Sequence, residues 1–500
     1  MEDSYKKLKK NAFTGILYQI VAVISAFILP QLFIRTYGSE VNGLINSIGQ
    51  FLSFIELADM GMGAVISSAL YAPLAARDDK IVSRIMNYAK KFYGVIGIIL
   101  VGYVLALSLI FPFLAQDSFS VGYTVTLLWA MSLSQFGEYF VGISNRVLLD
   151  ADQKTYIRQT INIIARIMSI IVSVAIIRYG GSIQDVQLFS SIIFLIQPVF
   201  MSFYVKRHYS LSYNEKADGS IVSSKRSGII QHLAYMIYGD TDVAVLTIFS
   251  DFSSVSIYSV YALVNNGIRA FIMAFLSGYQ AMFGNIIANN DTDRLHENFD
   301  FFEWLVHVLV SLLFTVTGIL IVPFVLTYTH GVRDANYRAS VFAVFITTAT
   351  AFSSVREAMY MLIKAAGHYK QTMKASLAEA LINLGLSVIL VFKLNLTGVA
   401  IGTLIASSFY VIYEMVYLSK NIVKRSINKV LKLCIDDGIV ITLTILLTSW
   451  VRITEYSYIF WLKNAVIVFA IALVISVVVQ ILFYKENVMK LLGRTKNAKN

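Results

Sequence analysis

The sequence has few charged residues for its length. Only 14% of its 500 residues are Asp, Glu, Lys or Arg, whereas 57% are hydrophobic. Soluble domains carry roughly 25% charged residues, so this chain lacks the polar surface of a cytosolic enzyme or a nucleic-acid-binding domain. It is also too hydrophobic to be disordered. The composition favours a polytopic membrane protein.

Other absences narrow the function. The chain has one cysteine, Cys434, which excludes an intrachain disulfide framework and a cysteine metal cluster. Its five prolines and 28 glycines exclude a low-complexity or fibrous chain. No Walker A pattern, HExxH motif or nucleophile elbow occurs. We therefore expect no enzyme activity, no catalytic residue and no metal site, and any transport must use an ion gradient, the membrane potential or downhill consumption of product.

Long apolar stretches, in contrast, are frequent. A membrane-spanning helix needs about 20 mostly apolar residues. The sequence predicts an all-α polytopic membrane protein with 14 transmembrane helices. The predicted spans are 11–36, 41–72, 92–114, 121–149, 157–178, 183–205, 228–250, 254–288, 302–327, 337–363, 373–392, 397–419, 433–451 and 459–483.

The basic residues predict the orientation of these spans. With the N-terminus in the cytoplasm, 30 of the 41 Lys and Arg residues fall in cytoplasmic segments and seven fall outside. The positive-inside rule then predicts that both termini are cytoplasmic. The basic residues are distributed over many short loops rather than one stripe, so we expect no nucleic-acid partner. No cleavable signal peptide is expected, because no small-residue cleavage site follows the first apolar stretch.

The chain contains a weak internal repeat. Three pairs of segments correspond at an offset of about 211 to 215 residues: 39–41 with 253–255, 110–113 with 321–324, and 149–156 with 363–370. Six spans separate the copies, so both halves have one orientation and should be related about the membrane normal. We predict two six-helix repeats plus two C-terminal helices, with a pathway between the repeats that opens by alternating access.

The repeat also predicts the domain organisation. The expected parts are an N-terminal six-helix bundle at 1–206, a cytoplasmic linker at 207–227, a C-terminal six-helix bundle at 228–420, and two extra transmembrane helices with a basic cytoplasmic tail at 421–500. Neither face carries a soluble domain large enough for catalysis.

Several segments resemble a known transporter family. They are 33–44 (FIRTYGSEVNGL), 54–63 (FIELADMGMG), 69–74 (ALYAPL), and 241–247 (TDVAVLT) continuing into 255–261. Together they resemble the polysaccharide transporter family, the O-antigen and capsule repeat-unit flippases of the multidrug/oligosaccharidyl-lipid/polysaccharide (MOP) superfamily. The resemblance covers most of the first 420 residues, and its motifs are loose.

The resemblance implies an activity and a location. The implied activity is translocation of an undecaprenyl-pyrophosphate-linked oligosaccharide from the inner to the outer leaflet, for capsule, O-antigen or exopolysaccharide synthesis. The implied location is the bacterial cytoplasmic (inner) membrane. The implied partners are the lipid-linked oligosaccharide, membrane lipids, and a polysaccharide polymerase and glycosyltransferases. By analogy with lipid-transporting members, the two extra helices would form a groove for the prenyl tail.

Arginines within the spans are candidates for substrate binding. Ionisable groups inside a membrane are costly and therefore suggest function, and a diphosphate matches the planar guanidinium group. Arg269 is the strongest candidate because at mid-span it cannot extend to the membrane surface. The full predicted set is Arg269, Arg146, Arg166, Arg356 and Arg35. The alternative for Arg356 is a local pair with Glu357 or extension to the surface.

Acidic residues within the spans have two alternative roles. They could bind Na⁺ or H⁺ and couple it to transport, or they could be ion-pair partners of the arginines. Glu56 and Asp59 share one helix face because they are three residues apart. The candidates are Glu56, Asp59, Glu138, Asp240, Asp242 and Glu379, with Glu414 as a further intramembrane acid. No other cofactor is predicted.

Two alternative functions remain open at this level. The first is a multidrug and toxin exporter of the same superfamily, which would exchange Na⁺ or H⁺ for organic cations and usually has twelve spans. The second is a membrane glycan polymerase or glycosyltransferase. That class normally has a large external loop or a cytosolic sugar-nucleotide domain, and the sequence has neither.

Overall fold

A computed structural model of the chain is all-helical, as predicted. It describes residues 2–59, 61–212, 214–217, 241–289 and 291–493. No strand occurs among these residues. The chain divides into two compact units, which we describe separately: unit 1 is Met1–Met236 with Asp251–Ser256, and unit 2 is Ile237–Ser250 with Ile257–Asn500. The four-part organisation predicted from the sequence remains a prediction.

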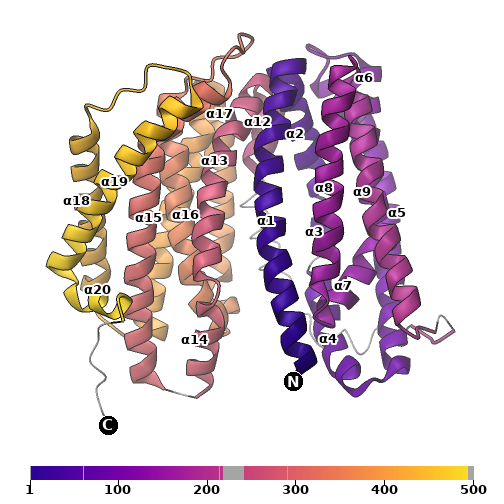
Figure 1. Ribbon diagram of the computed structural model, residues 1–500, viewed down its shortest axis with the longest axis horizontal. Helices are drawn as coiled ribbons and strands as arrows, with labels where there is room; N and C mark the ends of the chain where they lie inside the picture. The colour runs from indigo at the N-terminus through magenta and orange to yellow at the C-terminus, as the bar shows by residue number, and fades with distance from the viewer. Residues whose placement is uncertain (1, 60, 213, 218–240, 290, 494–500) are drawn as a thin grey trace. The chain divides into compact units, whose positions relative to one another are not determined.

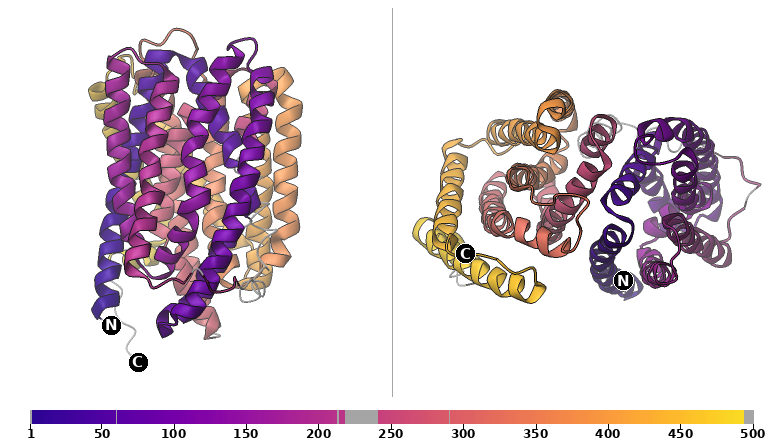
Figure 2. Two further views of the ribbon diagram at one scale, coloured as in Figure 1. Left: turned by 90° about the vertical axis from the view of Figure 1, so that its right-hand side faces the viewer. Right: turned by 90° about the horizontal axis from the view of Figure 1, so that it is seen from above.

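Unit 1 is a bundle of long helices that run alongside one another (Figures 1 and 2). Its helices are α1 (Glu2–Tyr37), α2 (Ser39–Ser53), α3 (Glu56–Asp59), α4 (Met62–Ala76), α5 (Asp79–Leu114), α6 (Val121–Gly137), the π-helix η1 (Glu138–Gly142), α7 (Ile143–Ala151), α8 (Thr155–Arg178) and α9 (Ile183–His208). The first turn of α13 also belongs to this unit.

Unit 2 is a second bundle and contains the two C-terminal helices. Its helices are α12 (Thr241–Phe249), α13 (Phe252–Leu276), α14 (Tyr279–Ala288), α15 (Thr292–Tyr328), α16 (Ser340–Ala365), α17 (Tyr369–Tyr417), the π-helix η2 (Leu418–Ile422), α18 (Asn428–Thr448), α19 (Tyr458–Phe483) and α20 (Lys485–Leu491). Both α18 and α19 pack on α15.

The helices coincide with the predicted spans. Eight described helices are long and apolar enough to cross a membrane, and the bent α2–α4 segment makes a ninth candidate. The predicted spans 121–149, 337–363 and 433–451 are also helical, but they are not among these candidates. The seventh predicted span is described only from Thr241 onward. The protein is a multi-pass membrane protein, and the count of fourteen spans remains a prediction.

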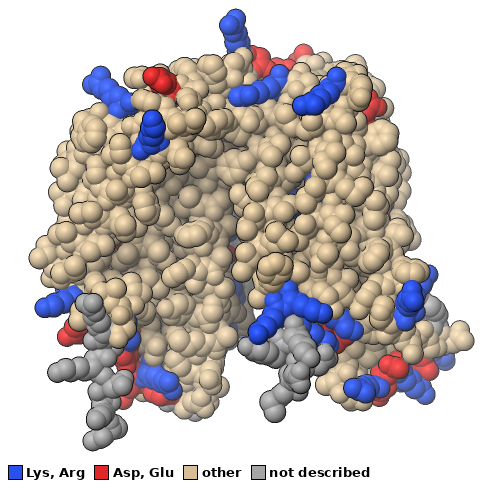
Figure 3. All heavy atoms as spheres, in the orientation of Figure 1, with Lys and Arg blue, Asp and Glu red and all other residues tan. Residues whose placement is uncertain are grey.

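Charged side chains lie at the ends of the helices. On the face shown in Figure 3, Lys, Arg, Asp and Glu gather at the two ends, and the surface between them is almost entirely uncharged. Exposed apolar side chains such as Leu109 (81% exposed), Ile389 (66%) and Leu482 (71%) cover the outer faces of helices in both units. Such large exposed apolar surfaces are expected where lipid is the solvent.

Helix starts and stops follow from local sequence. Asp78 accepts a hydrogen bond from the backbone N–H of Ile81 and thereby caps α5. Ser182 and Asp185 form a capping box at the start of α9. Two corresponding turns end α7 and α16: the N–H of Lys154 donates to the carbonyl of Leu149, and that of His368 donates to Ile363. These turns are the predicted repeat pair 149–156 and 363–370, and their backbone hydrogen bonds correspond.

Candidate functional site

Arg146 of unit 1 is paired with a predicted acidic residue. Its Nη1 atom lies 2.9 Å from Oε1 of Glu138, and the two side chains are 36% and 23% exposed. Glu138 opens the π-helix, whose wider turn often marks functional sites. A Cβ atom at Gly142 would lie 2.2 Å from the Glu138 carboxylate, so this glycine leaves room for the acid to fold along its own helix.

The remaining predicted acids of unit 1 gather near the same pair. The ring of Tyr139 is buried within electrostatic range of Glu56, Asp59, Glu138 and Arg146. The structure therefore brings together four predicted site residues, Glu56, Asp59, Glu138 and Arg146. Among the described residues, Tyr139 lies near three carboxylates and Arg146, and Arg158 also acts on Glu138, so Arg146 is not an isolated cation.

Arg166 has a different environment. Its Nη2 atom donates to the Tyr18 hydroxyl at 3.3 Å, and its guanidinium carbon lies 5.4 Å from the Tyr18 ring centroid. No ion pair joins Arg166 to a carboxylate within the described part of the chain. Arg35 is exposed in the last turn of α1. Of the three predicted arginines of unit 1, Arg166 is the one that lies within a span without a carboxylate partner among the described residues.

The two predicted arginines of unit 2 are both in ion pairs. The Nε atom of Arg269 lies 2.9 Å from Oε2 of Glu357, and the side chains are 28% and 26% exposed. Arg356 donates to Oε2 of Glu379 at 3.0 Å, and these side chains are 6% and 0% exposed. The alternative pairing of Arg356 with Glu357 is wrong, because adjacent helix residues point in different directions.

Asp242 lies in a buried cluster of neutral polar groups. The aspartate is 6% exposed. Its Oδ2 accepts hydrogen bonds from the hydroxyls of Tyr258 at 2.9 Å and Thr403 at 2.8 Å, and its Oδ1 accepts one from the Asn383 amide at 3.2 Å. Ser387 donates to the Asn383 amide oxygen at 3.0 Å. The other predicted acid of this span, Asp240, lies outside the described residues.

A close helix hairpin builds this cluster. Helix α17 turns at Asn395, whose φ of 48° and ψ of −129° break the helix. Its two limbs approach closely at Gly398 and Gly402, where a Cβ atom would lie 2.4 Å from the Leu390 carbonyl oxygen and 2.6 Å from the Ser387 hydroxyl. Asn383 and Ser387 on the first limb thereby face Thr403 on the second.

The cluster is rich in oxygen atoms. Hard cations prefer carboxylate, carbonyl and hydroxyl oxygens. A buried carboxylate is stable only when it is neutralised or fully hydrogen-bonded. The described groups around Asp242 offer hydroxyl and amide oxygens, and the residues that contact it carry no positive charge. Sequence reasoning missed Asn383, Ser387 and Thr403, although an Asn and a Ser four residues apart in an apolar span were a usable signal.

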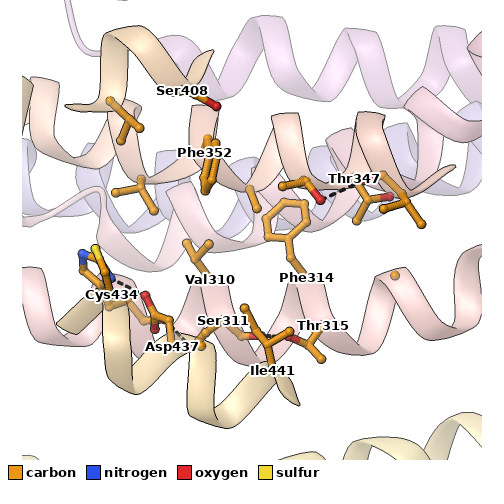
Figure 4. A pocket seen from close by; sticks show the side chains of 18 of the residues that line it. Val310, Ser311, Phe314, Thr315, Thr347, Phe352, Ser408, Cys434, Asp437 and Ile441 are labelled. Atoms are coloured by element: carbon orange, nitrogen blue, oxygen red, sulfur yellow. Dashed lines mark hydrogen bonds and ion pairs between the residues drawn. The ribbon is translucent and has the colours of Figure 1, made fainter. Parts of the chain in front are cut away.

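Unit 2 also contains a large apolar pocket. Its volume is about 660 Å³, and it lies between α15, α16, the second limb of α17 and α18. Figure 4 shows Phe314 and Phe352 reaching into it from two helices, with Cys434 and Asp437 at one end. At that end Nδ1 of His307 lies 2.5 Å from Oδ2 of Asp437. The pocket therefore combines apolar walls with one polar end.

Ion pairs hold α18 against α15 beside this pocket. The nearly buried Arg425 pairs with Asp300 at 2.6 Å and with Glu303, and Lys429 pairs with Asp300 at 2.6 Å. The guanidinium of Arg425 also lies 4.9 Å from the ring centroid of Phe299. These contacts fix the first of the two C-terminal helices as one wall of the pocket.

Comparison with known proteins identifies the fold. No protein-family model and no curated protein matches the sequence. Among solved structures, the lipid II flippase MurJ in an inward closed conformation aligns with a TM-score of 0.70 at 15% identity, over 95% of this chain and 99% of that one.

Multidrug exporters share the same architecture. An inward-facing multidrug resistance MATE transporter of the MOP superfamily aligns with a TM-score of 0.61 at 13% identity, over 80% of this chain and 95% of that one. A mutant of the Vibrio cholerae MATE transporter VcmN gives 0.57 at 13% identity, over 85% and 99%. The chain therefore has the transporter fold that the MurJ flippase and the MATE transporters share.

Proposed function

We propose that this protein is a flippase that moves an undecaprenyl-pyrophosphate-linked oligosaccharide from the inner to the outer leaflet by alternating access, for synthesis of a cell-surface polysaccharide. The observation that carries the proposal is the apolar pocket of unit 2. A polyprenyl chain is apolar and long, and it needs a continuous apolar surface as the polar head crosses the membrane. The pocket offers such a surface in about 660 Å³.

The helix α18 makes this pocket possible. It contributes Cys434, Asp437, Gly438, Ile441 and Ile445 to the lining. This helix belongs to the pair that the sequence predicts beyond a twelve-helix plan, and twelve spans are usual for drug exporters. The likeness to MurJ over 95% of the chain, against 80% for the inward-facing MATE transporter, also supports the flippase.

Arginine side chains would bind the diphosphate of the substrate. A guanidinium presents paired donors to phosphate oxygens. Arg166 is the leading candidate, because the described residues give it a tyrosine partner and no carboxylate. Arg146 and Arg269 could bind the diphosphate only by exchanging their partners, Glu138 and Glu357, for it. Such an exchange would link substrate binding to helix movement.

The Asp242 cluster would bind the coupling cation, such as Na⁺. Polar oxygens gathered between helices within the membrane commonly form ion sites in secondary transporters. Here the hairpin at Asn395 brings Asn383 and Thr403 to a buried carboxylate whose hydrogen-bond partners among the described residues are neutral. The cation enters this proposal as a transported substrate rather than as a resident cofactor.

A cation-coupled multidrug exporter is the second candidate. The MATE transporters of the same fold favour it, and so does the excess of carboxylates around Tyr139, since acids attract organic cations. The same acids are equally suited to pairing with arginine.

Deleting the gene separates these two functions. We expect complete undecaprenyl-pyrophosphate-linked repeat units to accumulate on the cytoplasmic side, detected by mass spectrometry of the lipid-linked glycan pool with a leaflet-accessibility probe. Re-expression of the wild-type chain should reverse the accumulation. An unchanged pool combined with new sensitivity to organic cations would reject the flippase and support the exporter.

A further inference from the structure

A second buried charge cluster in unit 2 shares no residue with the Asp242 cluster or with the lining of the apolar pocket. Its members are Arg356 on α16, Glu379 on the first limb of α17 and Glu414 on the second limb. They are 5%, 0% and 0% exposed. The ring of Tyr410 covers Arg356, with 5.5 Å between the ring centroid and the guanidinium carbon. The cluster is therefore buried away from solvent in the part of the chain that the structure describes.

The two glutamates have unequal partners. Glu379 accepts the hydrogen bond from Arg356 at 3.0 Å. Neither carboxyl oxygen of Glu414 has a hydrogen-bond partner among the described residues. Tyr410, one helical turn before Glu414, is a potential hydrogen-bond donor to it, but the angles are not those of a hydrogen bond. Glu414 is thus a fully buried acid aimed into a cluster whose arginine already pairs with another acid.

The surrounding charges do not fully neutralise this acid. On α16 the groups facing Glu414 are Arg356 and Lys364, and on α17 they are Glu379, Tyr410 and Tyr413. Lys364 is only half-buried and lies over a tyrosine ring, and it also acts on Glu357. An ionised carboxylate without donors in a dry interior is very costly, whereas a protonated one is an ordinary polar group.

A row of tyrosine rings leads away from the cluster, and the Tyr413 hydroxyl donates to the backbone carbonyl of Gln371 at 3.4 Å. The rings of Tyr410 and Tyr413 are stacked at 6.1 Å, and those of Tyr413 and Tyr417 at 6.0 Å. The Tyr417 hydroxyl lies 2.8 Å from Nδ1 of His368. His368 belongs to the turn between α16 and α17, which the sequence predicts to be cytoplasmic.

We propose that Glu414 is a proton-binding site, and that Tyr413, Tyr417 and His368 connect it to the α16–α17 turn. The proton comes from water, is carried as the neutral carboxylic acid of Glu414, and returns to water with no other bond made or broken. Its release leaves two buried carboxylates facing Arg356, which favours a rearrangement of the α17 hairpin against α16. Proton binding requires no lipid substrate; only its effect on transport rests on the proposed function.

Infrared spectroscopy of the full-length protein in lipid nanodiscs tests the site directly. A protonated carboxylic acid has a carbonyl stretch distinct from that of a carboxylate. We expect this band in the wild type at neutral pH, its loss in Glu414→Gln, and its return at a shifted frequency in Glu414→Asp. Glu357→Gln is the matched control, because Glu357 is a partly exposed glutamate in an ion pair, and it should leave the band unchanged.

Three outcomes would overturn the proposal. The first is a wild-type spectrum without the band, which needs no variant to fold. The second is a band that persists unchanged in Glu414→Gln. The third is a band lost in Glu379→Gln and retained in Glu414→Gln, which would assign the proton to Glu379.

The proposed route has its own readout. His368→Ala should slow the appearance of the band several-fold after a pH jump, and an equal rate would reject the route. Flippase activity is measured separately by lipid accumulation in cells. A negative infrared result therefore rejects the proton site without rejecting the flippase. An absence of lipid accumulation rejects the flippase without rejecting the proton site.

Discussion

One ion pair in each unit shows two different environments for interior charge. In unit 1 the pair of Arg146 and Glu138 is partly exposed, at 36% and 23%. In unit 2 the pair of Arg356 and Glu379 is 6% and 0% exposed. Partly solvated pairs contribute little to stability and exchange partners easily, whereas buried pairs are costly to break. The comparison suggests that partly exposed pairs, Arg146–Glu138 in unit 1 and Arg269–Glu357 in unit 2, serve transient substrate contacts, and that the buried Arg356–Glu379 pair is held tightly.

The largest expected change in stability comes from removing one partner of the buried Arg356–Glu379 pair. Arg356→Ala leaves Glu379 buried without its ion-pair partner, which should destabilise the protein by about 3–5 kcal/mol. Arg146→Ala, the matched change in unit 1, should cost about 0–1 kcal/mol because its pair is partly exposed. Thermal unfolding of both variants in detergent measures the difference. Equal destabilisation would contradict the contrast between the two units.

The next effect concerns the cation proposed at Asp242. Sodium chloride should raise the unfolding temperature of the wild type more than choline chloride does, because a bound cation stabilises the folded state. Asp242→Asn removes the charge of the cluster and should weaken cation binding at least about tenfold, or ~1.4 kcal/mol. Glu138→Gln in unit 1 is the control and should keep the sodium effect. Sodium stabilisation that survives in Asp242→Asn would move the cation site elsewhere.

A smaller effect tests the hairpin without removing a polar group. In Gly402→Ala the new Cβ atom would meet the Ser387 hydroxyl at 2.6 Å, so Ser387 must shift. We expect weaker sodium stabilisation and a cost of about 1–3 kcal/mol from overpacking. Gly385→Ala lies on the same helix with nothing within 4 Å of the added atom, and it should be nearly neutral. If the two variants behave alike, the close approach of the two limbs is not needed for the cluster.

The smallest expected effect is a pH-dependent change in stability. It compares the two corresponding turns, 149–156 in unit 1 and 363–370 in unit 2. Burial alone would raise the pKa of the Asp152 carboxyl in unit 1, but hydrogen bonds from Lys154, Tyr209 and Lys7 outweigh it and lower the pKa below its ordinary value of 3.8. At the corresponding turn of unit 2, Nδ1 of His368 lies 2.8 Å from the Tyr417 hydroxyl.

A lowered folded-state pKa gives stability that is fully present above pH 3.8 and is lost as the pH falls through the folded value. Asp152→Asn should therefore lose about 1 kcal/mol of stability at neutral pH and little in acid. Chemical denaturation across pH measures this difference. A variant as destabilised in acid as at neutral pH would show that the turn is not held by the Asp152 charge.

The sequence alone predicts much of the fold. Helices lie at every predicted span that the structure describes, because apolar length and short basic loops are strong signals in membrane proteins. It does not predict the breaks within spans. The π-helix at Glu138–Gly142 and the left-handed Gly61 between α3 and α4, with φ of 69°, depend on packing that hydropathy does not report.

The candidate sites are only partly readable from the sequence. Glu56, Asp59, Glu138 and Arg146 can be identified one by one, but their grouping around Tyr139 requires the bundle. Membrane burial makes every intramembrane charge stand out. It gives a weaker signal for neutral residues, so the roles of Asn383 and Thr403 as partners of Asp242 emerge only when the α17 hairpin places them.

Protection of Cys434 from chemical labelling tests whether the apolar pocket of unit 2 binds the lipid substrate. This residue is the only cysteine of the chain and lines the apolar pocket, so a maleimide reports access to the pocket without other substitutions. The flippase account predicts that undecaprenyl pyrophosphate slows labelling of the purified protein in nanodiscs, whereas an organic cation does not. Cys434→Ser carrying Ser449→Cys, at the end of α18, should label equally with and without the lipid. Labelling of Cys434 that the lipid leaves unchanged and an organic cation slows would contradict the account.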